Sequence, residues 1–374
     1  MFGEPGVDRY GYPRATANKL ALRALLAARR FRELTTYIES FQTEFEADFR
    51  KEYWPFDAID AFMTADPAVG ALIEQWAEAF PRSFAPWAAR AAHEIEVANV
   101  WRGVRTIDQV PGVRIAAMQR SQDRAWADTE HALQLRPRLV IAYRQQLTLI
   151  RHRSDPVAAT RVLDRALEIC PLCFQVRVTY FLALRPEWGG SWAAMLSFAG
   201  QTLDVAGNPR LAVVGALPDW YTCDRALIRG QSDVGRAACD RAIAIGDHWD
   251  FYWARGQLSA QANDYEHAIE DYRRAVEMRP QNLEAERSLS DALARHHDIE
   301  EGARVFLDSV RIEPVAPGLE ATATWWRRTL DREVARAQLT GRTDDTRRLA
   351  QLALELAPGD EIARNALQGA GAAR

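Results

Sequence analysis

The chain has 374 residues, of which 48% are hydrophobic, and its 47 basic and 51 acidic side chains give a formal charge of −4. A slightly acidic chain lacks the bulk positive charge that neutralises a phosphate backbone, so we expect no nucleic-acid partner. The hydrophobic content suffices for a sizeable core and excludes a largely disordered chain. No apolar run is as long as a membrane span, and the N-terminus has no hydrophobic signal region. Together with only four cysteines, this predicts a cytoplasmic protein without a membrane span.

Arginine dominates the basic residues, because only Lys19 and Lys51 are lysines. The excess of arginine over lysine has two possible explanations. One is functional, because a guanidinium binds carboxylates and phosphates bidentately, and the other is a GC-rich genome that encodes arginine in place of lysine. Most arginines fall at helical spacing from acidic residues, as Arg273 and Arg274 do beside Glu270 and Asp271. This pattern favours genome bias with surface ion pairs.

The N-terminal half begins with an irregular segment and continues with amphipathic runs. Residues 1–14 contain three glycines and two prolines and predict no regular element. Apolar periodicity then predicts helices at 18–28, 31–49, 56–63 and 67–80, which form two degenerate helical hairpins.

Four prolines that end amphipathic runs mark an internal repeat. Pro137 and Pro171 are 34 residues apart, and so are Pro280 and Pro314. The clearest unit covers residues 249–282, with small residues at Gly256, Ala268 and Ala275. Small residues allow two antiparallel helices to approach closely, and the proline cannot continue a helix.

This unit resembles a tetratricopeptide repeat, with Tyr252 at the first aromatic position and Tyr272 in the second helix. Weaker copies precede and follow it. The terminating proline after Pro314 comes late, at Pro358, which predicts a lengthened first helix at 319–339. A single helical hairpin cannot bury its apolar face, so neighbouring hairpins must stack.

These elements together predict an all-α fold, an α-solenoid of about nine antiparallel hairpins. The resemblance to tetratricopeptide repeats implies a right-handed superhelix. We expect an irregular segment at 1–14, a degenerate repeat-like domain at 15–205, and clearer repeats with a C-terminal capping helix at 206–374.

A second resemblance covers about residues 70–205. The succession of Trp76, the VANVWRG motif at 97–103 and the RPEWGGSW motif at 185–192 is similar to the bacterial family called domain of unknown function 4034. The family implies a repeat-like helical fold and no assigned activity. Read physically, Ser191 is a good N-cap for a helix at 192–203, and Trp188 anchors the preceding turn or, alternatively, contacts a ligand.

Candidate chemistry is sparse, and we predict no enzyme, no cofactor and no metal. Cys170 and Cys173 have a spacing that leaves three options open: a structural pair, a reversible disulfide, or part of a metal site. Cys223 and Cys239 fall at helix-packing positions, so we expect both to fill the core. Most tryptophans recur at helix-packing spacing, Trp101 among them, which predicts core rather than a cofactor site.

The remaining candidate is the concave face of the solenoid, where repeat folds hold extended partners. The groove positions of tetratricopeptide first helices, applied to this sequence, select aromatic, amide and charged residues that suit a peptide backbone and its carboxylates. The selected residues are Tyr143, Gln146, Arg177, Tyr180, Trp253, Gln257, Gln261, Arg287, Asp291 and Arg295.

We therefore expect a non-catalytic scaffold that binds a protein or peptide in this groove. The lysine clamp of chaperone-binding tetratricopeptide proteins is absent, because no lysine follows Lys51. Two alternatives stay open. One is a metal- or redox-dependent protein built around Cys170 and Cys173, and the other is a self-associating structural module of a secretion or envelope system.

Overall fold

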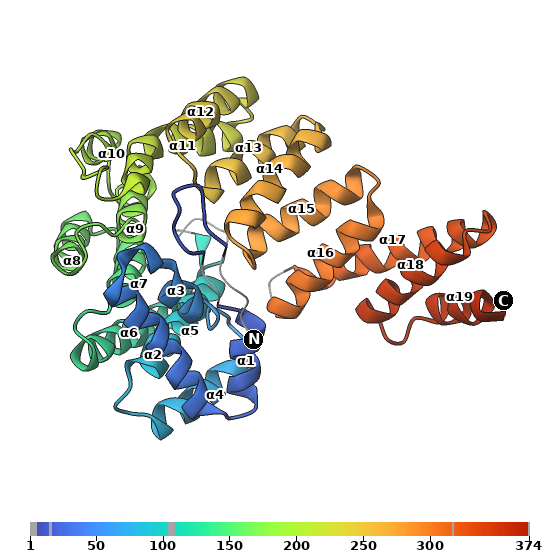
Figure 1. Cartoon of the computed structure of the whole chain (residues 1–374), viewed down its shortest axis with the longest axis horizontal. Helices are drawn as coiled ribbons and strands as arrows, with labels where there is room; N and C mark the ends of the chain where they lie inside the picture. Colours follow the sequence, from blue (N-terminus) through green and yellow to red (C-terminus); the bar gives the residue numbers. More distant parts are fainter. Residues whose placement is uncertain (1–5, 15–16, 104–108, 316–317, 373–374) are drawn as a thin grey trace. The chain divides into compact units, whose positions relative to one another are not determined.

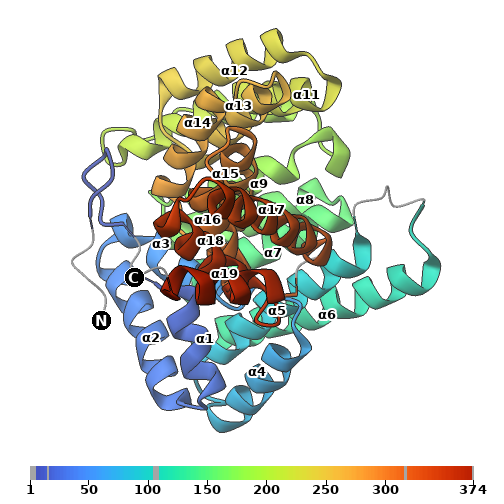
Figure 2. The same ribbon diagram turned by 90° about the vertical axis from the view of Figure 1, so that its right-hand side faces the viewer.

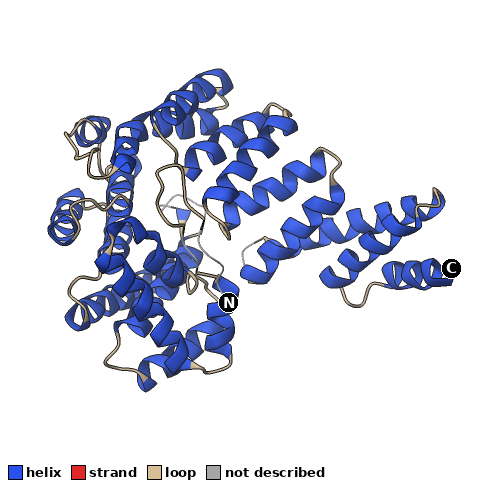
Figure 3. Cartoon of the chain, viewed as in Figure 1, coloured by secondary structure: helices blue, strands red, loops and turns tan. Residues whose placement is uncertain are grey.

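A computed structural model describes residues 6–14, 17–103, 109–315 and 318–372 of the protein. Within these ranges the chain forms 19 α-helices joined by loops and no β-strand (Figure 3). Successive helices pair along the chain, so the predicted all-α class and the solenoid of helical hairpins are confirmed (Figure 1).

The chain divides into two compact units. Unit 1 contains the residues up to Tyr221 together with Arg241–Asp247, and unit 2 contains Thr222–Asp240 together with the chain from His248 onward. The helices α11 (Ala212–Arg229) and α12 (Ser232–Ile245) each contribute residues to both units.

Among its described residues, unit 1 has ten further helices and three short 3₁₀ turns. The helices are α1 (Lys19–Ala27), α2 (Phe31–Ala47), α3 (Tyr53–Asp60), α4 (Pro67–Ala79), α5 (Phe84–Arg102), α6 (Gly112–Leu135), α7 (Val140–Arg153), α8 (Pro156–Ile169), α9 (Gln175–Ala183) and α10 (Trp192–Ala199). The turns are η1 (Phe49–Lys51), η3 (Pro186–Trp188) and η4 (Pro209–Leu211).

Unit 2 continues the chain as a regular run of hairpins. Its helices after α12 are α13 (Trp249–Gln261), α14 (Tyr265–Met278), α15 (Leu283–Arg295), α16 (Ile299–Ile312), α17 (Leu319–Leu339), α18 (Thr343–Leu356) and α19 (Glu361–Ala372). In each hairpin the first helix packs against the second, and α13 and α14 lie side by side in both views (Figure 1, Figure 2). The last helix, α19, packs on α17 and α18.

Close helix approach explains the small residues of the clearest repeat. A Cβ atom added to Gly256 of α13 would lie 2.7 Å from the Tyr272 ring of α14. Ala268, Ala275 and Tyr272 are buried. The glycine therefore creates the space that the tyrosine ring fills, as the spacing predicts.

Side-chain caps define several helix starts. The Ser191 hydroxyl accepts a hydrogen bond from the Ala194 backbone N–H, so the predicted cap of α10 is confirmed. The helix ends at Ala199, four residues before the predicted end. Asn282 caps α15 in the same way, through the N–H of Ala285.

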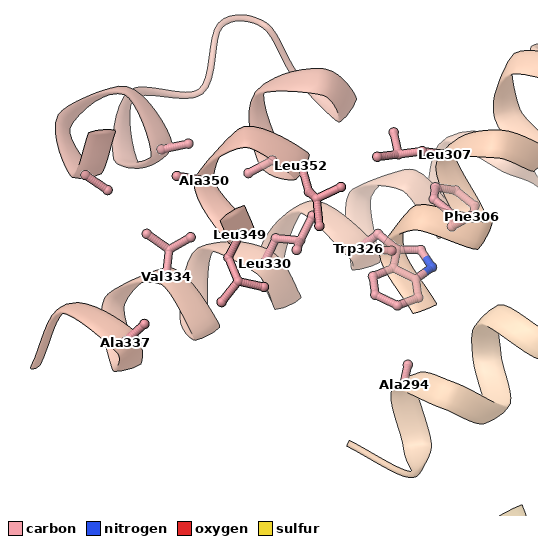
Figure 4. Packing of buried hydrophobic residues seen from close by; sticks show 14 residues of the cluster. Ala294, Phe306, Leu307, Trp326, Leu330, Val334, Ala337, Leu349, Ala350 and Leu352 are labelled. Atoms are coloured by element: carbon pink, nitrogen blue, oxygen red, sulfur yellow. The ribbon is translucent and has the colours of Figure 1, made fainter. Parts of the chain in front are cut away.

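The C-terminal core of unit 2 forms around the long helix α17. Its bounds agree with the range predicted from the delayed proline. Trp326 of α17 stacks on Phe306 of α16, with ring centroids 5.9 Å apart. Leu330 and Val334 continue this buried row toward α18 (Figure 4). Because no proline interrupts residues 319–339 and the apolar stripe continues along them, the helix extends over the whole range.

A buried polar network joins distant parts of unit 1. The carboxylate of Glu52, 1% exposed, accepts the backbone N–H groups of Phe174 (2.8 Å) and Gln175 (3.3 Å) at the start of α9. Arg210 forms an ion pair with Asp8 of the N-terminal segment and lies 3.8 Å from Glu52. Burial raises the pKa of Glu52, while Arg210 opposes that rise. Residues 6–14, although irregular, are therefore held by specific contacts.

One expectation from the sequence is wrong. Trp101 is 42% exposed, so it is not a core residue. Cys223 and Cys239 are buried in the core, as predicted, and they also form a disulfide. The two residues lie on neighbouring helices, α11 and α12, whose antiparallel packing brings their Cα atoms to 5.4 Å.

Candidate functional site

The first helices of unit 2 bring several predicted groove residues together. The Trp253 indole N–H and the Gln257 amide of α13 both donate to the Ser288 hydroxyl of α15, at 3.1 and 2.9 Å. The helices α13 and α15 contact each other, so these side chains form one polar row across consecutive repeats. Trp253 and Gln257 are half-buried. The row combines an aromatic face with amide groups, which suits an extended backbone.

The sequence prediction did not include Ser288, although it joins the two helices. Its signal is positional, because Ser288 is the sixth residue of its first helix and the sixth position is one that tetratricopeptide repeats turn to the groove. A small hydroxyl carries little chemical signal by itself. Only the two donors that converge on it mark its role.

Exposed polar groups continue the row toward the helix ends. Gln261 at the end of α13 is exposed, and its amide lies 3.5 Å from the Leu227 carbonyl oxygen. Arg295 at the end of α15 donates to Asp291 at 2.8 Å, and both side chains are exposed. The hydrogen bond from Arg295 to Asp291 raises the pKa of the guanidinium. An exposed pair of this kind is readily exchanged for a ligand contact.

Arg287 differs from every other predicted residue of this face. Its side chain is half-buried, and its Nε and Nη2 atoms have no hydrogen-bond partner. Burial lowers the pKa of Arg287, while Glu313 and Glu286 favour its charged form. A buried guanidinium with unused donors is energetically costly unless an acceptor is supplied.

Two predicted residues of α7 are committed to internal contacts. Tyr143 is buried, and burial raises its pKa. Gln146 is 1% exposed and donates to Thr129 and Glu130 of α6. Gln146 therefore holds α7 against α6, and neither side chain is presented to solvent.

The two predicted residues of α9 are also buried. Arg177 donates to the backbone carbonyl oxygens of Cys173 and Pro171, the latter at 2.8 Å, and so holds the loop before its own helix. Tyr180 shares a hydrogen bond of 2.9 Å with Thr160 of α8. The structure thus separates the predicted residues into a buried group in unit 1 and an accessible group in unit 2.

Cys170 and Cys173 are joined by a disulfide, so their sulfur atoms are not available as metal ligands in this state. Across the part of the chain that the structure describes, no cluster of three or more His, Cys, Asp or Glu side chains could hold a metal ion. The same residues contain no helix long and apolar enough to cross a membrane.

Comparison with known proteins places family matches on both units. Residues 18–157 match the model of the domain of unknown function (DUF4034), and residues 249–282 match that of the tetratricopeptide repeat. The first match shares residues 70–157 with the range expected from the sequence, and the motif at 185–192 lies beyond it. No curated protein matches the chain in sequence.

Three solved structures illustrate what the chain is similar to. YrrB, described as having an unusual peptide-binding site, is 12% identical over 64% of this chain and 97% of its own, with a TM-score of 0.27. The P58(IPK) TPR domain is 11% identical over 81% and 72%, with a TM-score of 0.30. Yeast Tom70 is 12% identical over 86% and 61%, with a TM-score of 0.43. Residues 18–157 are therefore similar to the DUF4034 family, and residues 249–282 are similar to a tetratricopeptide repeat.

Proposed function

We propose that the protein is a non-catalytic scaffold that binds an acidic peptide, or an acidic extended segment of a partner protein, on the first helices of unit 2. Tetratricopeptide folds commonly mediate protein–protein binding, and such scaffolds are typically non-enzymatic. The observation that carries the proposal is Arg287, a half-buried guanidinium whose Nε and Nη2 have no acceptor. A ligand carboxylate supplies acceptors with the planar geometry that a guanidinium prefers.

The neighbouring groups complement the peptide backbone. The amide N–H of Gln257 is already used by Ser288, which orients its carbonyl oxygen as an acceptor for main-chain N–H groups. Gln261 is exposed and offers both a donor and an acceptor. Arg295 exchanges Asp291 for a second carboxylate of the ligand at small cost, because that ion pair is exposed.

The test uses calorimetry on the full chain with short Glu- and Asp-rich peptides that carry a free carboxy terminus. We expect the double charge reversal Arg287→Glu with Arg295→Glu to weaken binding by about a hundredfold, since two charge-assisted contacts become repulsive. The matched control is Arg273→Glu with Arg304→Glu, two exposed arginines of the second helices α14 and α16. Equal binding by both variants removes this face from consideration.

The two disulfides make the expected cytoplasmic location testable. Disulfides persist in oxidising compartments and are rare in a reducing cytoplasm. Alkylation of protein extracted from its native cells counts the free thiols. If both disulfides are present in the cell, no cysteine is alkylated. If the compartment is reducing, all four cysteines are free thiols and are alkylated.

A further inference from the structure

Two arginines converge on Trp188 in unit 1, at a place that the peptide-binding proposal does not use. Trp188 ends the turn η3, and the Cζ atoms of Arg102 and Arg151 lie 5.2 and 5.4 Å from the centre of its ring. Arg102 is the last residue of α5, and Arg151 lies in the last turn of α7. We call Trp188, Arg102, Arg151 and His152 the Trp188 cluster; the His152 ring lies 5.4 Å from the indole.

Positive charge accumulates in this cluster. Burial lowers the pKa of Arg151 to about 10, and the charged groups that add to this effect are two further cations, Arg185 and Arg102. Arg185 has its own acidic neighbour, Glu187, at 3.6 Å. The Nε atom of Arg151 is buried and has no hydrogen-bond partner.

Helix ends explain part of the arrangement. Cations are stabilised near helix C-termini, and Arg102 lies within 3.4 Å of the Gly103 carbonyl oxygen. A helix end offers about half an elementary charge, which does not balance two guanidinium groups that share one indole. The indole face stabilises each cation further but adds no counter-charge. The positive charge that remains and the unused Nε–H donor of Arg151 would both be stabilised by a bound anion.

We propose that the Trp188 cluster binds a phosphate dianion through Arg102 and Arg151. Two guanidinium groups carry two positive charges, which a phosphate dianion balances and a single carboxylate does not. The tetrahedral oxygens accept hydrogen bonds from both guanidinium forks, while the indole holds the forks in place. Without a bound anion, burial and the two arginines lower the pKa of His152 to about 3.

The matched control residue is on the same helix. Arg153 of α7 is exposed, lies over Trp126 and forms an ion pair with Asp123. It therefore shares the helix end and the aromatic contact with Arg151 but has a carboxylate of its own. Arg153→Gln removes one positive charge from the same helix terminus without touching the Trp188 cluster.

The experiment measures thermal stabilisation and calorimetric binding of the full chain with inorganic phosphate, using acetate at equal ionic strength as reference. We expect saturable binding of phosphate by the unchanged chain and by Arg153→Gln, and about tenfold weaker binding by Arg151→Gln and by Arg102→Gln. O-phosphoserine identifies the source: tighter binding than phosphate indicates an organic phosphomonoester, and equal binding indicates the free ion.

Two results overturn the proposal. Stabilisation by phosphate that does not exceed that by acetate shows that the cluster selects no dianion. Equal loss in Arg151→Gln and Arg153→Gln shows that general charge, and not the Trp188 cluster, attracts the ion. If Arg151→Gln does not fold, the phosphate affinity of Arg102→Gln is compared with that of Arg153→Gln instead, and equal affinities overturn the proposal. The site lies in unit 1 and the peptide face in unit 2, so each proposal fails independently of the other.

Discussion

The same repeat positions have opposite fates in the two units. In unit 1 the predicted groove residues Gln146 and Arg177 are buried and hold neighbouring loops and helices. In unit 2 their counterparts Gln257 and Arg287 are half-buried. Position in the repeat therefore indicates which way a side chain points, while the elements packed around it decide whether solvent reaches it.

The difference follows the regularity of the repeat. The match to the tetratricopeptide repeat lies in unit 2, where each hairpin contacts mainly its neighbours. In unit 1 the loop from Cys170 to Phe174 is hydrogen-bonded to two side chains. Glu52 lies far from the loop in the sequence, and Arg177 follows it directly in α9. Such added contacts cover positions that an open solenoid leaves exposed. Four measurements test this difference between the units.

The largest effect is expected from Arg177→Ala. It removes two hydrogen bonds and leaves the carbonyl oxygens of Cys173 and Pro171 without these donors, so we expect a loss of about 3 kcal/mol in the free energy of unfolding. Chemical denaturation followed by circular dichroism measures it. Arg295→Ala is the control, with a change of about 0.3 kcal/mol, because its ion pair is exposed. Equal losses would erase the contrast between the units.

Acidification probes both units through one buried histidine each. The pKa values of His152 in unit 1 and His248 in unit 2 are lowered to about 3, mainly by burial. Below pH 6.5 the unfolded chain takes up protons that the folded chain does not, so stability falls as pH drops from about 6.5 toward 3. Each histidine contributes a loss of about 2 kcal/mol between pH 7 and pH 5.

The variant His248→Gln assigns this pH dependence to unit 2. We expect it to reduce the loss of stability between pH 7 and pH 5 by about 2 kcal/mol, the contribution of one histidine. Urea denaturation at several pH values gives the slope. An unaltered slope in His248→Gln would mean that this ring is protonated in the folded protein.

Gly256→Ala tests the close packing of the clearest repeat. The new methyl group would lie 2.7 Å from the Tyr272 ring, so we expect a loss of about 1.5 kcal/mol from overpacking. The control is Gly359→Ala, where an added Cβ has no neighbour within 4 Å. Thermal unfolding of both variants compares the two sites. A neutral Gly256→Ala would show that α13 and α14 can move apart without cost.

Ser288→Ala has the smallest expected effect. It removes the acceptor shared by Trp253 and Gln257, and half-exposed donors turn to water instead, so we expect a loss of about 1 kcal/mol or less. Affinity for the acidic peptide should fall as well, because the Gln257 amide is no longer oriented. Denaturation and calorimetry on the same preparation separate the two effects, and unchanged affinity would remove Gln257 from the proposed face.

Local patterns in the sequence predicted the hairpins. The 34-residue spacing of Pro280 and Pro314, the small residue Gly256 and the N-cap Ser191 act within one hairpin or one turn, so they can be read without knowledge of distant contacts. The bounds of α17 followed from the same logic, since a missing break allows a helix to continue.

Tertiary packing decided what the side chains do. The Cys223–Cys239 disulfide depends on how two helices face each other, and the burial of Arg177 depends on the loop it holds. Trp188 lies between arginines that are 49 residues apart in the sequence, at the ends of two different helices. Hydrophobic periodicity specifies which face of a helix is buried, but exposure, charge balance and pairing arise only when residues distant in sequence come within a few ångströms of one another.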